Sequence, residues 1–206
     1  MILVGQYDSP FVRRVAVTLH HYGLPFTRNT ISVFSDAVEM TRFNPLGRIP
    51  SLVLDDHETL IDSAAILDHL DETVGPRALV PRSGPERRHV LRIMAVACGT
   101  VDKAGLGIVY ERHFHTPEAV NQGWIARCKG QIAGALGWLE QHLEGDWFIG
   151  RFSQADITTG CLMGYLHLRL PEVLGDFPKL EQLSVRCEGL PDFVNARPAP
   201  DEVMPG

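Results

Sequence analysis

Ser9 and Pro10 stand at the start of a predicted helix, directly after an apolar N-terminal segment. A serine hydroxyl at this position caps the helix, and proline at the first helical position loses no hydrogen bond. The same hydroxyl, beside the unpaired N–H groups of a helix start, could also hold a ligand's anion. From this stretch alone capping is sufficient, and anion binding stays open.

The sequence Arg48-Ile49-Pro50 precedes the apolar run SLVL. A proline at the first residue of a strand need not donate to the sheet. A trans bond is the common state. If the Ile49–Pro50 bond is cis instead, the N–H and C=O of Ile49 are exposed to an extended peptide ligand.

Asp62 and Ser63 form a third polar pair, at the start of another predicted helix. Both residues can act as simple caps. Together they could also bind a zwitterion, with Ser63 and the free N–H groups taking a carboxylate and Asp62 an ammonium group.

Ser153 and Asp156 fit a capping box at the start of an apolar helix, with Phe152 and Ile157 as a hydrophobic staple. The interpretation here is structural. Replacing Asp156 by alanine is expected to cost on the order of 1 kcal/mol of stability or more.

The composition is that of an ordinary globular protein. The 206 residues are 45% hydrophobic and carry a net charge of −6, which argues against nucleic acid as the main partner. No apolar run approaches the roughly 20 residues of a membrane span, and the N-terminus lacks the basic region of a signal peptide. We therefore expect a cytoplasmic protein without membrane contact. Four widely spaced cysteines are expected to be reduced: Cys98, Cys128, Cys161 and Cys187.

The pattern up to Val74 predicts an α/β domain, in which a small mixed sheet carries helices on its faces. A strand–helix–strand unit is followed by a hairpin, which implies both parallel and antiparallel pairing. The predicted strands are Ile2–Tyr7, Phe26–Val33, Ser51–Leu54 and Glu58–Ile61, and the predicted helices are Pro10–Tyr22, Ser35–Arg42 and Asp62–Val74.

The stretch Gly75–Pro85 carries three prolines and two glycines, which is typical of a linker. Beyond it the sequence pattern predicts only helices. The predicted domains are 1–76 and 86–206, joined by a linker at 77–85, and the tail from Arg197 is expected to be surface coil. The predicted helices of the second half are Glu86–Arg112, Pro117–Leu143, Gln154–Leu170 and Phe177–Cys187.

The order and spacing of these motifs resemble the cytosolic glutathione S-transferase superfamily, and the SPFVRRV context resembles its serine-type bacterial members. The matching segments are Ser9–Val15, Asn44–Pro50, Asp62–Ser63 and Gly150–Ile157. The resemblance implies a thioredoxin-like N-terminal domain, an all-helical C-terminal domain and a homodimer.

The resemblance also implies how glutathione, γ-Glu-Cys-Gly, would be bound as co-substrate. Asp62 and Ser63 would hold the γ-glutamyl group, and Ile49, beside a cis Pro50, would pair its main chain with the cysteinyl unit. Arg48 would lie close to the tripeptide, and Ser9 would donate to the sulfur.

Ser9 would then stabilise a thiolate rather than act as the nucleophile itself. A free thiol has a pKa near 8.5, and lowering it by about two units needs roughly 2.7 kcal/mol, a plausible sum for one charge-assisted hydrogen bond and a helix dipole. Tyr7 is the rival donor, because tyrosine serves in other classes of the superfamily. The absence of cysteine at position 9 argues against thiol transferase or dehydroascorbate reductase activity.

The electrophile site is expected between the two domains, with Phe11, Tyr110 and Phe114 as candidate apolar residues. His113 and His115 lack further ligands at suitable spacing, so no metal is predicted. Asp102 is a candidate to reach the glutathione of a partner subunit.

The sequence thus predicts a glutathione transferase acting on small hydrophobic electrophiles, with peroxidase as a side activity. The alternative is a non-catalytic protein that binds glutathione or a hydrophobic ligand on the same fold. Glutathione-dependent isomerisation or dehalogenation is a third hypothesis, since related serine-type classes perform both.

Overall fold

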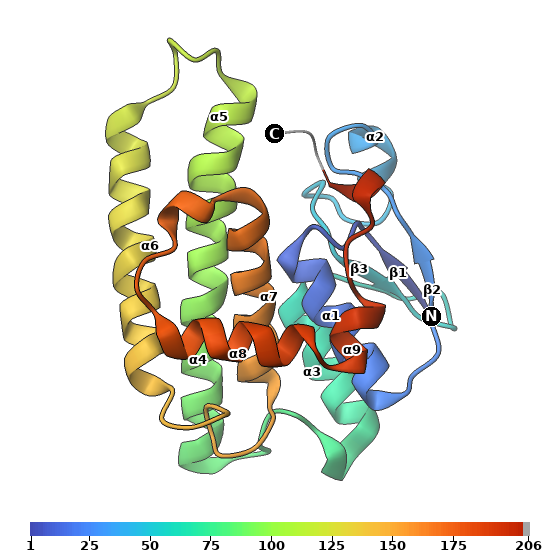
Figure 1. The fold of residues 1–206 in the computed structure, drawn as a ribbon. Coiled ribbons are helices and arrows are strands. Elements are labelled where there is room, and N and C mark those ends of the chain that lie inside the picture. Colours follow the sequence, from blue (N-terminus) through green and yellow to red (C-terminus); the bar gives the residue numbers. More distant parts are fainter. Residues whose placement is uncertain (204–206) are drawn as a thin grey trace. The chain divides into compact units, whose positions relative to one another are not determined.

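The computed structural model describes residues 1–203, and the chain divides into two compact units. The first unit consists of Met1–Val80 together with the C-terminal segment that begins at Glu188, and the second consists of Pro81–Cys187. The strands all lie in the first unit, and the second unit consists of helices and their connections (Figure 1).

The first unit contains a four-stranded mixed sheet with the strand order β2-β1-β3-β4. β1 pairs in parallel with β2 and antiparallel with β3, and β3 pairs antiparallel with β4. The strands are β1 (Ile2–Val4), β2 (Thr27–Asn29), β3 (Ser51–Val53) and β4 (Thr59–Leu60). The predicted mixed sheet is confirmed, with shorter strands than the sequence predicted.

Helices accompany this sheet. α1 begins with Pro10 at its first position and ends at Gly23, whose left-handed backbone (φ 66°) closes the helix, as the sequence predicted. The helices of the unit are α1 (Pro10–Tyr22), α2 (Ala37–Met40), α3 (Ser63–Val74) and α9 (Pro191–Asn195), with 3₁₀ turns at Gly75–Arg77 and Pro200–Glu202.

Alternation along β1 divides the core of this unit between the two faces of the sheet. Val4 packs with Ile31 and with Met40 of α2 in one buried cluster. Leu3, its neighbour, is fully buried and points to the opposite face because successive strand residues alternate. α1 and α3 contact each other and pack on β1 and β3, respectively.

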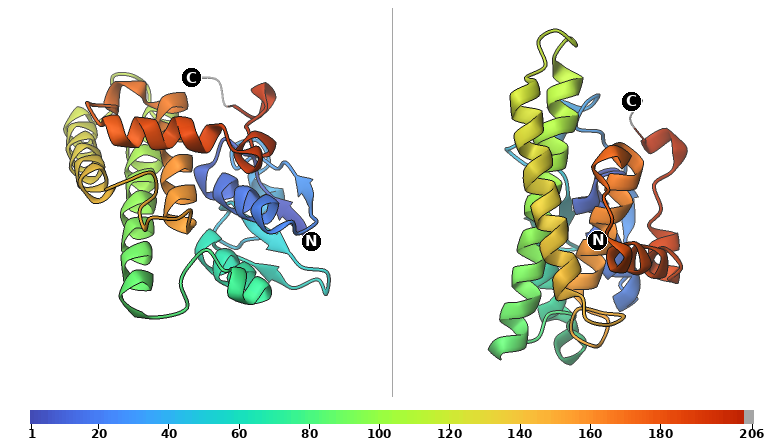
Figure 2. Two further views of the ribbon diagram at one scale, coloured as in Figure 1. Left: turned by 60° about the horizontal axis from the view of Figure 1, so that its bottom comes forward. Right: turned by 60° about the vertical axis from the view of Figure 1, so that its left-hand side comes forward.

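The second unit is all-helical, as predicted. α4 packs against both α6 and α7. The helices are α4 (Gly84–Ala104), α5 (Tyr110–Phe114), α6 (Gln122–His142), α7 (Gln154–Arg169) and α8 (Pro178–Glu188), with a π turn at Gly105–Val109 and a 3₁₀ turn at Pro171–Val173. Figure 2 shows α4 and α6 as long neighbouring helices in two further views.

The predicted helix Glu86–Arg112 is interrupted by the π turn at Gly105–Val109. A Cβ on Gly107 would lie 2.6 Å from the Sγ of Cys128, so a side chain there would prevent this close approach of the turn to α6. By length and composition, 84–114 would also suffice to cross a membrane, since an 18-residue window within it has a mean hydropathy of 1.4. This is weak evidence, since the core helix of a soluble protein passes the same test.

The first unit extends beyond the predicted domain end at residue 76. Leu79 and Val80 are buried, and their N–H groups donate to the carboxylate of Asp71 at 3.3 and 3.2 Å. The Leu79 N–H also donates to the hydroxyl of Tyr22, at 2.7 Å. The start of the predicted linker is therefore fixed against α1 and α3.

The tail from Arg197, expected to be surface coil, contains a 3₁₀ turn in which Glu202 is buried. Together with α9 it belongs to the same compact unit as the sheet rather than to the helical unit (Figure 1). The C-terminal segment is held to the sheet unit by Arg13 of α1, which is only 5% exposed. Its guanidinium donates to both carboxylate oxygens of Glu188, at 2.6 and 2.8 Å, and to the carbonyl of Ala196 at 3.0 Å. A buried charge needs such partners, and this segment supplies them.

Candidate functional site

Ser9 is the N-cap of α1 and is half-buried. Its Oγ accepts a hydrogen bond from the N–H of Val12 at 3.5 Å, which is long for a hydrogen bond to a hydroxyl oxygen. A serine hydroxyl can accept two hydrogen bonds and donate one. This single long bond therefore leaves the hydroxyl with capacity to donate to a ligand at the helix start.

The turn that leads into α1 is held from within. The N–H of Ser9 donates to the carbonyl of Gln6 at 3.2 Å. Tyr7, inside this turn, is 2% exposed, and the Arg28 guanidinium carbon lies 3.5 Å from the centre of its ring. Burial raises the pKa of Tyr7, an effect that Arg28 opposes and Glu202 reinforces. Tyr7 is therefore a packed, neutral phenol, whereas Ser9 is the more accessible of the two hydroxyls.

Gly5 brings this turn close to the proline loop, and sequence reasoning missed it. Its backbone has φ 127°, in the region that favours glycine. A Cβ at this position would lie 2.7 Å from Cγ2 of Val12 and 2.9 Å from Cβ of Ile49. The signal in the sequence was a glycine between an apolar strand and the Ser-Pro pair.

The loop before β3 is ordered by Asn44, which is 4% exposed. Its amide donates to the carbonyl of Arg48 at 3.0 Å and accepts from the N–H of Leu46 at 2.9 Å. The bond between Ile49 and Pro50 is cis, so this prediction is confirmed. The side chain of Arg48 is exposed at the edge of the loop.

Asp62 is the N-cap of α3, where its Oδ1 accepts from the N–H of Ala64 at 3.0 Å and from the hydroxyl of Ser63 at 3.1 Å. Ser63 is fully buried, and its Oγ also accepts from Nε and Nη2 of Arg14, at 3.2 and 2.7 Å. The hydroxyl of Ser63 thus already makes one donated and two accepted bonds. A ligand at this helix start would meet the exposed Asp62 carboxylate and the N–H groups of the first turn.

Arg14 is the second residue that sequence reasoning missed. It is 3% exposed, so its charge is fixed behind the start of α3. Its guanidinium also lies 5.7 Å from the ring centre of Phe11, which is half-buried on α1. The available signal was a pair of arginines inside an otherwise apolar helix.

The other candidate residues belong to the second unit. Tyr110 and Phe114 lie together on α5, with ring centres 5.6 Å apart, and Phe114 is 64% exposed. Asp102 is half-buried near the end of α4. Within the described residues 1–203, no group of three His, Cys, Asp or Glu side chains is placed to hold a metal ion.

A surface hollow of about 420 Å³ lies in the second unit, and none of the residues predicted for the site lines it. Arg186 in its wall donates to Asp146 at 2.6 Å, so these two charges pair with each other. The hollow is lined by Leu143, Glu144, Gly145, Asp146, Lys179, Gln182 and Arg186.

The β2-β1-β3-β4 sheet, the cis proline before β3 and the all-helical second unit define a protein with a thioredoxin-like domain followed by a helical domain. The N-terminal domain model of the glutathione S-transferases matches residues 3–78, and the C-terminal domain model matches residues 122–198. The chain belongs to the glutathione S-transferase family.

Three relatives illustrate the likeness. The uncharacterized GST-like protein YibF of Escherichia coli K12 is 30% identical over 202 residues, covering 96% of this chain and 98% of its own. A maleylacetoacetate isomerase of Pseudomonas aeruginosa is 29% identical over 211 residues, covering 97% and 96%. The crystal structure of a Methylobacterium radiotolerans glutathione S-transferase in complex with glutathione sulfonate has a TM-score of 0.89 and 30% identity, covering 96% and 94%.

Proposed function

We propose that this protein is a glutathione transferase in which Ser9 stabilises the glutathione thiolate for attack on small hydrophobic electrophiles, with peroxidase as a side activity. The observation that carries the proposal is the hydroxyl of Ser9, half-buried at the start of α1 with one long hydrogen bond of 3.5 Å. Gly5 holds this helix start close to Ile49, whose bond to Pro50 is cis. A structural relative whose crystals contain glutathione sulfonate supports the choice of ligand.

The two polar helix starts of the first unit would bind opposite parts of the tripeptide. Asp62 would take the γ-glutamyl ammonium group, and the N–H of Ser63 would take the adjacent carboxylate, while the N–H of Ala64 stays bonded to Asp62 at 3.0 Å. The buried charge of Arg14, hydrogen-bonded to Ser63, adds positive potential at this helix start. The main chain of Ile49 would pair with the cysteinyl unit, and Arg48 would lie beside the tripeptide.

The reaction needs little from the protein beyond this arrangement. The thiol proton leaves to solvent, and the sulfur lone pair forms the new bond to carbon of the electrophile while its leaving group departs. Ser9 stays protonated and donates to the sulfur, which lowers the thiol pKa. Phe11, Tyr110 and Phe114 would offer apolar surface to the electrophile.

A second candidate is glutathione-dependent isomerisation. A maleylacetoacetate isomerase among the relatives, matching 97% of this chain, favours it over the remaining alternatives. Isomerisation would use the same thiolate, which adds to a double bond, permits rotation and is eliminated again. A maleylacetoacetate-type substrate therefore belongs in the assay beside the electrophiles. A protein that only binds glutathione would show neither turnover nor a lowered thiol pKa.

Steady-state turnover of glutathione with a chlorodinitrobenzene-type acceptor tests the proposal. Replacing Ser9 by alanine should lower kcat about 100-fold, the usual cost of removing one donor to a developing or stabilised anion. Ser83→Ala is the matched control, because Ser83 is the N-cap of α4 and makes no side-chain cap hydrogen bond. A Ser9→Ala enzyme as fast as wild type would overturn the proposal.

We further propose a cytoplasmic homodimer, as the resemblance implies. The four cysteines are thiols in the structure, which suits a reducing compartment. Analytical ultracentrifugation would show a dimer if this proposal holds and a monomer if it fails.

A further inference from the structure

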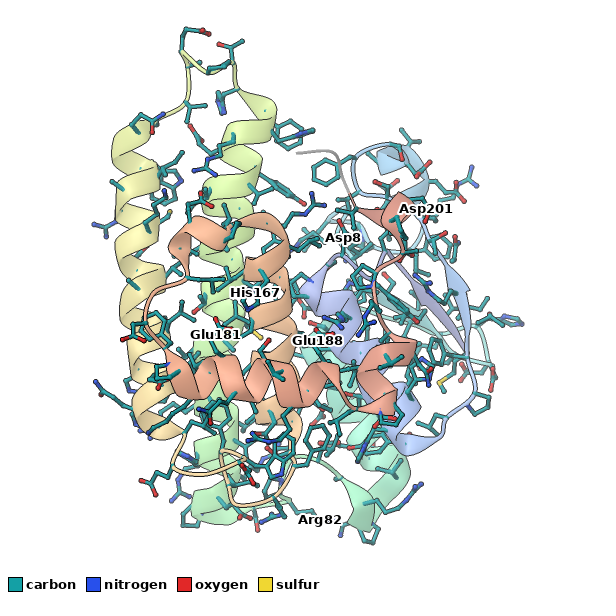
Figure 3. All side chains as sticks on the ribbon, viewed as in Figure 1. Asp8, Arg82, His167, Glu181, Glu188 and Asp201 are labelled. Carbon is teal, nitrogen blue, oxygen red and sulfur yellow. The ribbon has the colours of Figure 1, made fainter. Side chains whose placement is uncertain are left out.

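Glu202, in the C-terminal 3₁₀ turn, is a carboxylate that is only 6% exposed. One of its oxygens accepts from the guanidinium of Arg28, and the other accepts from the N–H of Ala199 at 3.1 Å. Figure 3 labels Asp201 in the same turn. Acidic side chains are rarely buried unless they are paired, so this contact fixes both the turn and the arginine.

Arg28, on β2, carries this contact to the beginning of α1. Its guanidinium carbon lies 3.5 Å from the centre of the Tyr7 ring, close enough for a strong cation–π contact. Leu3 of β1 is the register partner of Arg28, and the N–H of Gly5 donates to the carbonyl of Asn29 at 2.8 Å. Arg28 is thus held at its backbone by the sheet and at its side chain by Glu202.

Tyr7 connects the side chain of Arg28 to the turn that contains Ser9. It lies within the turn closed by the bond from the N–H of Ser9 to the carbonyl of Gln6, at 3.2 Å. The Tyr7 ring is buried beneath the guanidinium, in the same turn as the N–H of Ser9. Loss of the cation above the ring is expected to loosen the packing of the ring and of this turn.

We propose that Glu202 and Arg28 are positioning residues that act through Tyr7 to hold Ser9 in the orientation required for catalysis. The inference rests on the proposed role of Ser9. It gives the C-terminal segment a part in the reaction, although that segment supplies no group that touches the substrate.

Anchoring of the C-terminal segment alone does not require Glu202. The segment is already fixed at Glu188 by two hydrogen bonds from the buried Arg13, at 2.6 and 2.8 Å, and at Ala196 by a third, at 3.0 Å. Figure 3 labels Glu188, which begins the C-terminal segment of this unit. The effect of losing the Glu202 carboxylate should therefore fall mainly on Arg28 and the turn beneath it.

The test compares Glu202→Gln, Arg28→Gln and Arg28→Lys in steady-state assays with glutathione. Glu202→Gln and Arg28→Gln should lower kcat about tenfold while the KM for glutathione stays within about twofold, because a misplaced donor weakens the chemical step more than binding. Arg28→Lys keeps a cation over the ring and should recover part of the loss. A purely structural role predicts loss of folded enzyme without this division between kcat and KM.

Asp192→Asn is the matched control. Asp192 lies in the same C-terminal segment and contacts His21 near the other end of α1, at 3.0 Å. Its variant should keep the wild-type kcat. Equal losses in Asp192→Asn and Glu202→Gln, or an unchanged kcat in Glu202→Gln, would overturn the proposal.

Hydrogen exchange at the amide of Ser9 gives a readout that does not depend on turnover. The amide should exchange about tenfold faster in Glu202→Gln and in Arg28→Gln than in wild type, because the turn opens more often. Arg28→Lys, which keeps the cation, should show a smaller increase. Unchanged exchange in both Glu202→Gln and Arg28→Gln would overturn the proposal. If wild type and Ser9→Ala prove equally active, the proposed role of Ser9 fails, and faster exchange would still show that Glu202 and Arg28 hold the turn.

Discussion

The starts of α1 and α7 carry the same residue type at the same position and use it differently. Ser9 is half-buried, and its Oγ has one bond of 3.5 Å. Ser153 is fully buried, its Oγ donates to Oδ2 of Asp156 at 2.7 Å, and its N–H donates to the same oxygen at 2.8 Å. The difference shows that an N-cap serine is available for chemistry only where neighbouring groups do not already use its hydroxyl.

The α7 capping box also ties the preceding loop to the helix. Oδ1 of Asp156 accepts from the N–H of Phe148 at 3.0 Å, so one carboxylate satisfies groups of both Phe148 and Ser153. The predicted box is confirmed. Its satisfied hydrogen bonds and complete burial explain why the structural interpretation of this serine is sufficient.

Truncating each cap and measuring unfolding in urea tests whether the two helix starts differ in their contribution to stability. Asp156→Ala should lower the free energy of unfolding by about 2 kcal/mol, since several buried donors lose their acceptor. Ser9→Ala should lower it by less than about 1 kcal/mol, because only one long bond is lost. The rate per folded molecule should remain normal in Asp156→Ala. A larger loss of stability in Ser9→Ala would reverse the roles assigned to the two caps.

The pH dependence of the free energy of unfolding tests the role of Asp156 in the α7 cap. Burial raises the pKa of Asp156 to about 6, although hydrogen bonds from Ser153 and Phe148 act to lower it. An unfolded aspartate titrates near 3.9, so the folded state binds this proton more tightly. The free energy of unfolding of wild type, relative to Asp156→Asn, should therefore fall as pH rises from about 4 to about 6. A rise over that window would contradict the assignment.

The smallest effect is expected from the neighbouring phenol. Tyr7→Phe keeps the ring beneath Arg28 and removes only the hydroxyl, so kcat should change by less than about threefold. Steady-state assays beside Ser9→Ala make the measurement. A loss as large as that of Ser9→Ala would transfer the role of sulfur donor to Tyr7.

Local signals in the sequence predicted the elements that local chemistry determines. The bounds of α1 agree with the prediction because Ser9, Pro10 and Gly23 mark its ends unambiguously. The strand predicted at Phe26–Val33 is shorter in the structure, Thr27–Asn29, since only that part pairs with β1. β propensity indicates where a strand can form, but the partner determines its length.

The contacts that shape the site were beyond sequence reasoning because they join distant residues. Arg14 binds Ser63 in another helix, and Arg28 binds Glu202 near the end of the chain. A sequence shows that a charge lies in an apolar setting, but it does not show which residue pairs with it. Gly5 could have been noticed, since a glycine at the end of a strand often marks a close approach.

Titration of bound glutathione tests the central claim most directly. The ultraviolet absorbance of the thiolate is followed against pH in wild type and in Ser9→Ala, both saturated with glutathione. We expect a thiol pKa about two units below its free value in wild type, and a return most of the way toward about 8.5 in the variant. Equal thiol pKa values in the two proteins would contradict the central claim.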